Sequence, residues 1–183
     1  AVLDAVEYSA HPHMLLVGTR EYHDLPHQEA IQQALAEGAF VVLNHPNWIR
    51  HEYLPWEMAD ALQGYCGIEI LNPVIYRLKG SGLALDTWDH LLTSGRQIWG
   101  FGNDDFHLWH DLQRAYNIVF ARSAAFEDIK EAVLEGCFYV SDGVALKHLA
   151  LEEDALEVEA GFFTESYVET LDYCLVGTEG RVL

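Results

Sequence analysis

The chain has 183 residues, half of them hydrophobic and 21% charged, a composition that supports a packed core and excludes a disordered chain. Its formal net charge of -19 leaves too few Lys and Arg side chains for a nucleic-acid surface. No apolar run approaches the roughly 20 residues that a membrane-spanning helix needs. We therefore expect neither nucleic acid nor a membrane as a partner, and the composition leaves the oligomeric state open.

The first half of the chain alternates apolar strands with helices. Strands are expected at residues 2–8, 13–18, 39–43 and 67–72, and helices at residues 25–37 and within 48–62. The strand at 39–43 is apolar throughout, which indicates burial on both of its faces. Gly38 is expected to cap the helix before it.

The same alternation continues to about Gly143. Helices are expected at residues 85–94 and 123–135, and strands at 98–101, 116–121 and 138–140. Gly95 and Gly136 follow the two helices at the position where a glycine commonly ends a helix. The order strand, helix, strand predicts parallel strands joined by crossover helices.

The pattern changes after Ala145. Short alternating apolar runs at 149–151, 156–159 and 171–176 follow one another with no helical pattern between them. We therefore divide the chain into a strand–helix portion at residues 1–145 and a small antiparallel β-rich appendage at residues 146–183.

The three cysteines are widely spaced and form no CxxC pair. This usage is typical of a reducing compartment and predicts a cytoplasmic protein. The chain begins with Ala1 and lacks a basic-then-apolar leader, so we expect a fragment or a processed chain.

Polar side chains follow several predicted strands at the point where each strand ends, and the densest group lies at residues 102–107. Asp105 and His107 are two positions apart, which in an extended segment places both side chains on the same side. A carboxylate and an imidazole that converge in this way suit a divalent metal. The alternative is an Asp-rich turn that carries a solvated histidine. Asn44-His45-Pro46, after the buried strand at 39–43, repeats the pattern.

These stretches resemble motifs of the PHP superfamily, named for its polymerase and histidinol phosphatase members. Residues 102–107 look like its Asp-x-His motif, and Asn44-His45-Pro46 looks like its His-Pro motif. Glu7, followed by His13 and the apolar strand after it, is similar to the family's Glu and its His-Leu-Leu-Gly strand. Residues 68–72 and 135–143 match further recurrent stretches, in the family's order.

The resemblance implies an α/β fold, a distorted (β/α) barrel of the PHP type that occupies residues 1–145. The barrel is expected to be incomplete at its N-terminus, because the family's His-x-His and Asp-His motifs should precede the matched Glu and neither does so here. His11-Pro12-His13 has the His-x-His form but lies after Glu7. The family binds two or three divalent metals, commonly Zn, Mn or Fe. Carried over by position, the implied metal ligands are Glu7, His13, His45, Asp105 and His107, and the last three are also the implied catalytic residues.

The activity that this resemblance implies is metal-dependent hydrolysis of a small phosphorylated metabolite by a metal-bound hydroxide. Two alternatives remain open: a non-catalytic PHP-like module that binds metal or a partner, and hydrolysis of a bond other than a phosphoester. Glu69 and Asn72 are expected to line the pocket, although Glu69 is equally compatible with a strand-edge acid. Asp104 is expected to cap the turn or to contact a metal ligand. Glu7 as an edge-strand carboxylate and His13 as a hydrogen-bonded core histidine are the ordinary alternatives for those positions.

Overall fold

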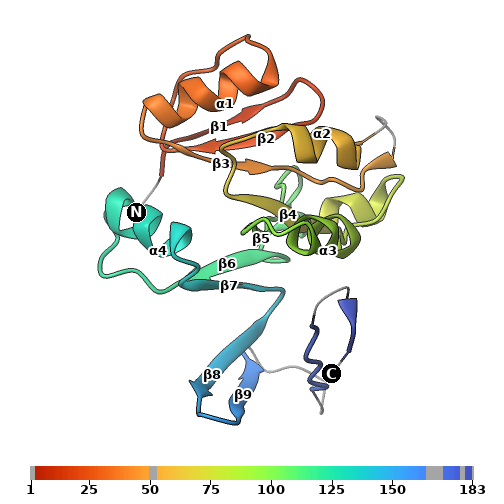
Figure 1. Ribbon diagram of the computed structural model, residues 1–183, viewed down its shortest axis with the longest axis vertical. Helices are drawn as coiled ribbons and strands as arrows, with labels where there is room; N and C mark the ends of the chain where they lie inside the picture. The colour runs from red at the N-terminus through yellow and green to blue at the C-terminus, as the bar shows by residue number, and fades with distance from the viewer. Residues whose placement is uncertain (1–2, 50–52, 164–170, 178–179, 183) are drawn as a thin grey trace.

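The computed structural model describes residues 3–49, 53–163, 171–177 and 180–182. A five-stranded sheet in the order β1-β2-β3-β4-β5 lies at its centre (Figure 1). The strands are β1 (Ala5–Tyr8), β2 (Met14–Val17), β3 (Phe40–Leu43), β4 (Gly67–Leu71) and β5 (Trp99–Gly102). β2 runs antiparallel to both β1 and β3, whereas β3, β4 and β5 are parallel to one another. The prediction of parallel strands is therefore confirmed for β3 to β5 and wrong for β2, and it is wrong for the later pair Tyr116–Val119 and Phe138–Ser141, which is antiparallel.

The predicted (β/α) barrel is wrong as well. Over the described residues, the strands form one open sheet of five and two separate two-stranded sheets, and none of these closes into a barrel. The connection between β1 and β2 gives the physical reason. Parallel neighbours need a crossover of about a dozen residues or more, and the loop at residues 9–13 is too short for one. The chain therefore turns back on itself, and β2 pairs antiparallel to β1.

Helices cover the two faces of the sheet unequally (Figure 1). The described α-helices are α1 (His27–Ala36), α2 (Trp56–Ala61), α3 (Leu85–Thr93) and α4 (Phe126–Leu134). Buried residues of α1, α2 and α3 pack in one core, and α4 packs in the other. None of these described helices combines the length and the apolar character that crossing a membrane requires.

β3 separates the two cores. Val41 and Leu43 lie in the core formed with α1 to α3, and Phe40 and Val42 lie in the core formed with α4. Successive side chains of a strand point to opposite faces, so a strand with a core on each side is apolar at every position. All four residues of β3 are buried, which confirms the prediction made from its sequence.

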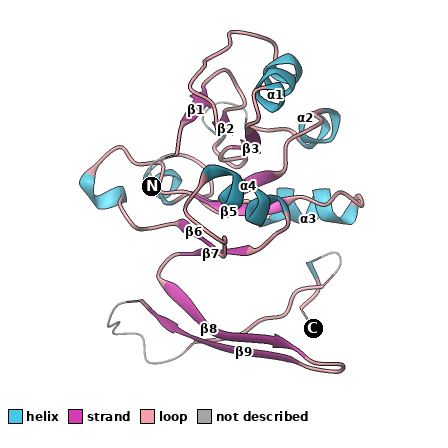
Figure 2. Ribbon diagram, turned by 90° about the vertical axis from the view of Figure 1, so that its left-hand side faces the viewer, coloured by secondary structure: helices cyan, strands magenta, loops and turns pink. Residues whose placement is uncertain are grey.

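Two smaller sheets follow the central one. β6 (Tyr116–Val119) pairs antiparallel with β7 (Phe138–Ser141), and β8 (Val144–Leu151) pairs antiparallel with β9 (Leu156–Phe162). The β8–β9 hairpin extends away from the central sheet (Figure 2). It confirms the strands predicted at 149–151 and 156–159. The strand predicted at 171–176 is wrong, because only Val176 forms a β-bridge there, with Val182.

A substitution at Ile68, in the middle of β4, tests how much the core formed with α1 to α3 contributes to stability. Its side chain has 0% exposure, so Ile68→Ala should remove packed methyl groups and leave a cavity. We expect a loss of about 2–5 kcal/mol in the free energy of unfolding, measured by urea denaturation. The matched control is Ile49→Ala at a side chain that is 70% exposed, where the change should stay within about 0.5 kcal/mol. Equal losses at the two positions would contradict this packing.

The carboxylate of Glu37, directly after α1, accepts several hydrogen bonds whose contribution to stability should depend on pH. The Thr19 hydroxyl donates to Glu37 Oε2 at 2.6 Å, and Gln33 and His23 bond to Oε1. These hydrogen bonds lower the pKa of Glu37 from 4.5 to about 2. The ionised carboxylate therefore stabilises the fold above its unfolded pKa of 4.5, and this contribution is lost as pH falls towards 2.

Glu37→Gln should accordingly lower the melting temperature at neutral pH, and its difference from the wild type should shrink as pH falls through 4.5 towards 2. Thermal melts monitored by circular dichroism across this range measure that difference. Glu29→Gln, on the exposed side of α1, serves as the control. A difference that stays constant down to the lowest pH would show that Glu37 is not held in its ionised form.

Candidate metal centre

Strand direction brings the candidate ligands to one edge of the sheet. β1, β3, β4 and β5 run in the same direction, so their carboxyl ends meet at this edge. β2 runs the opposite way and therefore begins there, with His13 directly before it. Glu7 lies near the end of β1, and His45 lies two residues beyond the end of β3. Antiparallel pairing thus places His13 beside side chains that follow the other strands.

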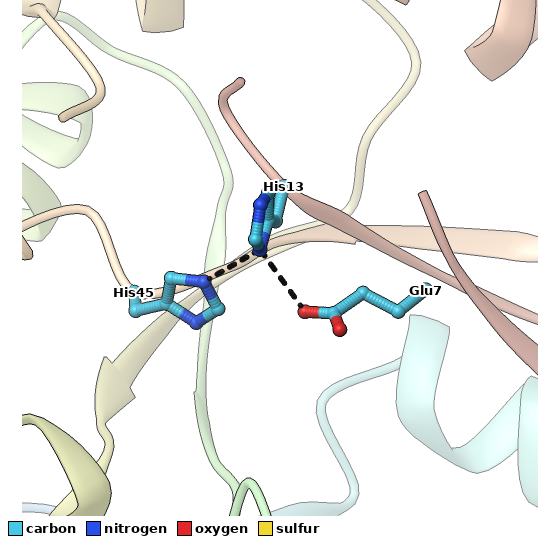
Figure 3. A group of neighbouring side chains, drawn as sticks. All are labelled: Glu7, His13 and His45. Carbon is cyan, nitrogen blue, oxygen red and sulfur yellow. Dashed lines mark hydrogen bonds and ion pairs between the residues drawn. The ribbon is translucent and has the colours of Figure 1, made fainter. Parts of the chain in front are cut away.

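Glu7, His13 and His45 form a group that could hold a metal ion (Figure 3). One ligand atom from each lies within 4.8 Å of the others. His45 Nε2 is 3.1 Å from His13 Nδ1, which is 3.4 Å from Glu7 Oε1. Two imidazole nitrogens and one carboxylate oxygen are a donor set that zinc and related divalent metals accept.

The buried carboxylate of Glu69 fixes the orientation of His45. Glu69 Oε2 accepts the backbone N–H of His45 at 2.7 Å and lies 3.1 Å from His45 Nδ1. An ionised carboxylate has no proton to donate, so Nδ1 carries the hydrogen, and in the neutral imidazole Nε2 keeps its lone pair towards His13. A carboxylate behind a histidine is the arrangement that orients histidine ligands in metal sites.

Negative charge predominates around His13 and His45. Burial lowers the pKa of His45, but the hydrogen bond and charge of Glu69, with the charges of Asp105 and Glu7, raise it overall above 6.5. The hydrogen bond with His13 lowers the pKa of Glu7 below 4.5, against the effect of burial, and Asn44 also donates to this carboxylate. Several carboxylates therefore surround two imidazoles, and a bound cation would balance their charge.

Asn72 joins the carboxylates that lie behind and beside His45. Its Nδ2 donates to Glu69 Oε2 at 2.9 Å and to Asp105 Oδ2 at 3.1 Å, and its Oδ1 accepts the backbone N–H of Val74. Asn103 donates to the other oxygen of Glu69 at 2.8 Å. Asn72 is only 1% exposed. Glu69 and Asn72, predicted to line the pocket, thus lie behind its wall and position the residues that line it.

A cavity of about 260 Å³ opens over this group. It is lined by Glu7, His13, His45, Trp48, Val74, Ile75, Arg77, Leu78, Asp105 and His107. All five side chains predicted as metal ligands therefore face one cavity, although Asp105 and His107 are not members of the compact group of three. His107 Nδ1 lies 2.6 Å from the backbone oxygen of Asp105, and the His107 side chain is 62% exposed.

Asp104 points elsewhere. Its carboxylate accepts the backbone N–H groups of Gln113, Arg114 and Ala115 at 2.6, 2.6 and 2.8 Å. It lines a different cavity, together with Gln113 and other residues of the β6–β7 region. Asp104 therefore accepts the backbone N–H groups of one turn, and it is not among the residues that line the cavity around Glu7, His13 and His45.

Aromatic rings pack beside the two histidines. Trp48 lies 5.8 Å from His13 and 5.4 Å from His45 between ring centroids, and Tyr53 lies 5.5 Å from His45. His11, in the loop between β1 and β2, stacks on His13 at 5.0 Å and 9°. This packing restricts the orientations of both imidazoles and reduces the access of water to them.

Two residues that belong to this region, Arg77 and Asp111, were not predicted from the sequence. Asp111 is 3% exposed and accepts hydrogen bonds from Arg77 Nη2 at 2.9 Å and from the backbone N–H groups of His107 and Leu108. Burial raises the pKa of Asp111, but these hydrogen bonds lower it overall to about 2. The position of Asp111, four residues after His107, could have suggested a carboxylate that accepts backbone N–H groups of the same loop. Arg77 gave no local signal, because its partner lies 34 residues away.

Comparison with solved structures identifies a protein of similar fold. It is a two-domain protein from Bacteroides vulgatus ATCC 8482 that contains a predicted PHP-like metal-dependent phosphoesterase. The alignment has a TM-score of 0.61 and 16% sequence identity, and covers 88% of this chain and 55% of that one. This chain therefore spans about half the length of its structural neighbour. No protein-family model and no curated protein sequence matches it.

At 16% identity, the likeness shows a shared fold and nothing further about function. It supports the resemblance to PHP proteins that the motifs indicate. Separate support for metal binding comes from the distances between the ligand atoms of Glu7, His13 and His45, which all lie within 4.8 Å of one another. The identity of the metal stays a prediction.

Glu69→Gln tests the arrangement behind His45. The variant removes the negative charge and gives Nδ1 of His45 a different partner, so the affinity for Zn²⁺ or Mn²⁺ should fall about 10- to 100-fold. Isothermal titration calorimetry on metal-stripped protein measures this affinity. Glu29→Gln on the exposed side of α1 should leave it unchanged. Equal affinities for wild type and Glu69→Gln would show that Glu69 does not support a metal ligand.

Proposed function

We propose that this chain forms a metal-dependent hydrolase site that cleaves the phosphoester of a small molecule. The observation that carries the proposal is the convergence of Glu7, His13 and His45 on one cavity that Asp105 and His107 also line. Structural likeness to a protein that contains a predicted metal-dependent phosphoesterase supports the same reaction class.

The donor set fits a divalent cation. Glu7, His13 and His45 would hold it, since their ligand atoms already lie within 4.8 Å of one another and Glu69 orients the lone pair of His45. When bound, a divalent cation supplies Lewis acidity towards a phosphoryl oxygen and lowers the pKa of a coordinated water. We propose Asp105 and His107 as further ligands on the wall of the same cavity.

The residues of the chain then orient the reactants and handle protons. The backbone carbonyl oxygen of Asp105 only accepts hydrogen bonds, so His107 Nδ1 at 2.6 Å donates to it. In the neutral imidazole, His107 Nε2 then has a lone pair, which can accept a proton in the cavity or bind a cation. Trp48, Val74 and Ile75 supply apolar lining that limits the water around the reacting group.

A metal-binding module without catalysis is the second candidate. The observation that favours it is the size of the compact group, since three ligand-type side chains of the described residues form it and can hold one cation. A two-metal hydrolase holds its cations about 3.5–4 Å apart and needs ligands for both. The two candidates agree on metal binding and differ in turnover.

Hydrolysis of p-nitrophenyl phosphate by metal-stripped protein, with and without Mn²⁺ or Zn²⁺, tests the proposal. We expect turnover only with metal, reduced at least about 100-fold in His45→Ala and in Asp105→Ala, because loss of an outer partner alone costs about 10- to 100-fold. His148→Ala, at an exposed position of β8, controls for the loss of a histidine and should keep full activity.

Two results would count against phosphoester hydrolysis by this site. Turnover that survives both His45→Ala and Asp105→Ala would place the activity outside the cavity. Stoichiometric metal binding without turnover of any phosphoester would favour the non-catalytic module.

A further inference from the structure

Charge in the cavity is strongly asymmetric. Glu7 and Asp105 line it and are acidic, and the chain as a whole has a formal net charge of -19. Among the described residues that line the cavity, Arg77 is the one Lys or Arg side chain. An anionic ligand that enters the cavity is therefore repelled by the carboxylates and, among the protein's own fixed charges there, attracted by Arg77.

The Arg77 side chain is held in place at one end of its guanidinium group. Arg77 is the last residue of the short 3-10 helix η2 (Pro73–Arg77), and its Nη2 donates to Asp111 Oδ2 at 2.9 Å. That bond uses one of the five N–H groups of the guanidinium. The Arg77 side chain is 37% exposed, whereas the Asp111 side chain is 3% exposed. Arg77 thus has a buried anchor and an accessible part on the cavity wall.

Asp111 couples Arg77 to a proposed metal ligand. The same carboxylate oxygen that accepts the Arg77 bond also accepts the backbone N–H groups of His107, at 3.0 Å, and Leu108, at 2.7 Å. The loop that carries His107 and the helix that carries Arg77 are therefore fixed to one buried group. A ligand between Arg77 and the candidate metal centre would meet two positioned partners.

We propose that Arg77 is the anion-binding residue of this cavity and that it makes the site selective for phosphomonoesters. The inference rests on the proposed function and names its substrate class. A terminal phosphoryl group presents three non-bridging oxygens and close to two negative charges, enough to contact both a cation and a guanidinium fork. A phosphodiester has two non-bridging oxygens and one charge, and a carboxylic ester has no charge, so both gain less from Arg77.

The size and lining of the cavity agree with a monoester. Its volume of about 260 Å³ is below the range of about 300–1,000 Å³ that is typical of drug-sized ligands. Val74, Ile75 and Leu78 provide apolar lining on the same segment as Arg77. One small organic group can pack there beside the phosphoryl group.

Arg77 has a purely structural alternative, which is to neutralise the buried Asp111. Removal of one partner of a buried pair leaves an uncompensated charge and destabilises the fold. That role predicts a lower melting temperature and no change in selectivity among esters. Anion binding predicts weaker binding of phosphate and a smaller preference for monoesters, whatever happens to stability.

The test uses Arg77→Met, which removes the charge, and Arg77→Lys, which keeps the charge and loses the planar fork. Metal-loaded proteins are compared for kcat and KM on p-nitrophenyl phosphate, bis-p-nitrophenyl phosphate and p-nitrophenyl acetate, and for binding of inorganic phosphate by calorimetry. Metal content and thermal melts are recorded for each variant. Arg20→Met is the matched control, since Arg20 is exposed and follows the other end of β2, where it pairs with Asp4.

We expect Arg77→Met to weaken phosphate binding and to raise KM for the monoester about 10- to 100-fold, with much smaller effects on the diester and the acetate. Arg77→Lys should fall between wild type and Arg77→Met. If Arg77→Met does not fold, Arg77→Lys carries the test, because it keeps a cation beside Asp111. Unchanged phosphate affinity and unchanged ester selectivity in folded, metal-loaded variants would overturn the proposal.

Failure of the proposed function gives a different result. If the wild type hydrolyses none of the three esters, the hydrolase proposal is wrong, and the affinity of the metal-loaded protein for inorganic phosphate still tests Arg77. A fall in that affinity in Arg77→Met would support an anion-binding residue in a non-catalytic module. An affinity equal to that of the wild type would reject it.

Discussion

The buried carboxylate of Glu69 is the group on which the candidate metal centre depends. It accepts hydrogen bonds from the backbone and the imidazole of His45 and from the amides of Asn72 and Asn103. These donors follow β3, β4 and β5, so one charge joins the ends of three parallel strands. Because a buried carboxylate is costly unless its oxygens are satisfied, the three loops adopt the conformations that supply its partners.

A metal centre of this kind requires a shared edge of a sheet and does not require a closed barrel. The parallel strands contribute the residues that follow them, and the antiparallel β2 contributes His13, which precedes it. The second group of hydrogen bonds, around Asp111, then adds the His107 loop and Arg77 to the same cavity. Two buried carboxylates thus position the residues that line the site: Glu69 holds His45, and Asp111 holds Arg77 and the His107 loop.

Much of the local structure could be predicted from the sequence, because its causes are local. Glycines predicted to end helices, Gly38, Gly95 and Gly136, have φ values of 89°, 86° and 76°, in the left-handed region that favours glycine. The direction of β2 was missed, although the short loop before it implies antiparallel pairing. Arg77 could not have been found in this way, because its pairing with Asp111 depends on the folded chain.

The joint between the central sheet and the β6–β7 pair has a mechanical consequence. Over the described residues, the outer edge of β5 has no backbone ladder to β6. Instead, the Asn117 side chain accepts from the backbone N–H of Gly102 and donates to its carbonyl oxygen. Without a ladder between these strands, the angle between the sheets depends on side-chain contacts, including the stack of Phe101 on Phe138 at 4.9 Å. The setting of the β6–β7 pair against the central sheet is therefore determined by the shapes of the apolar side chains between them.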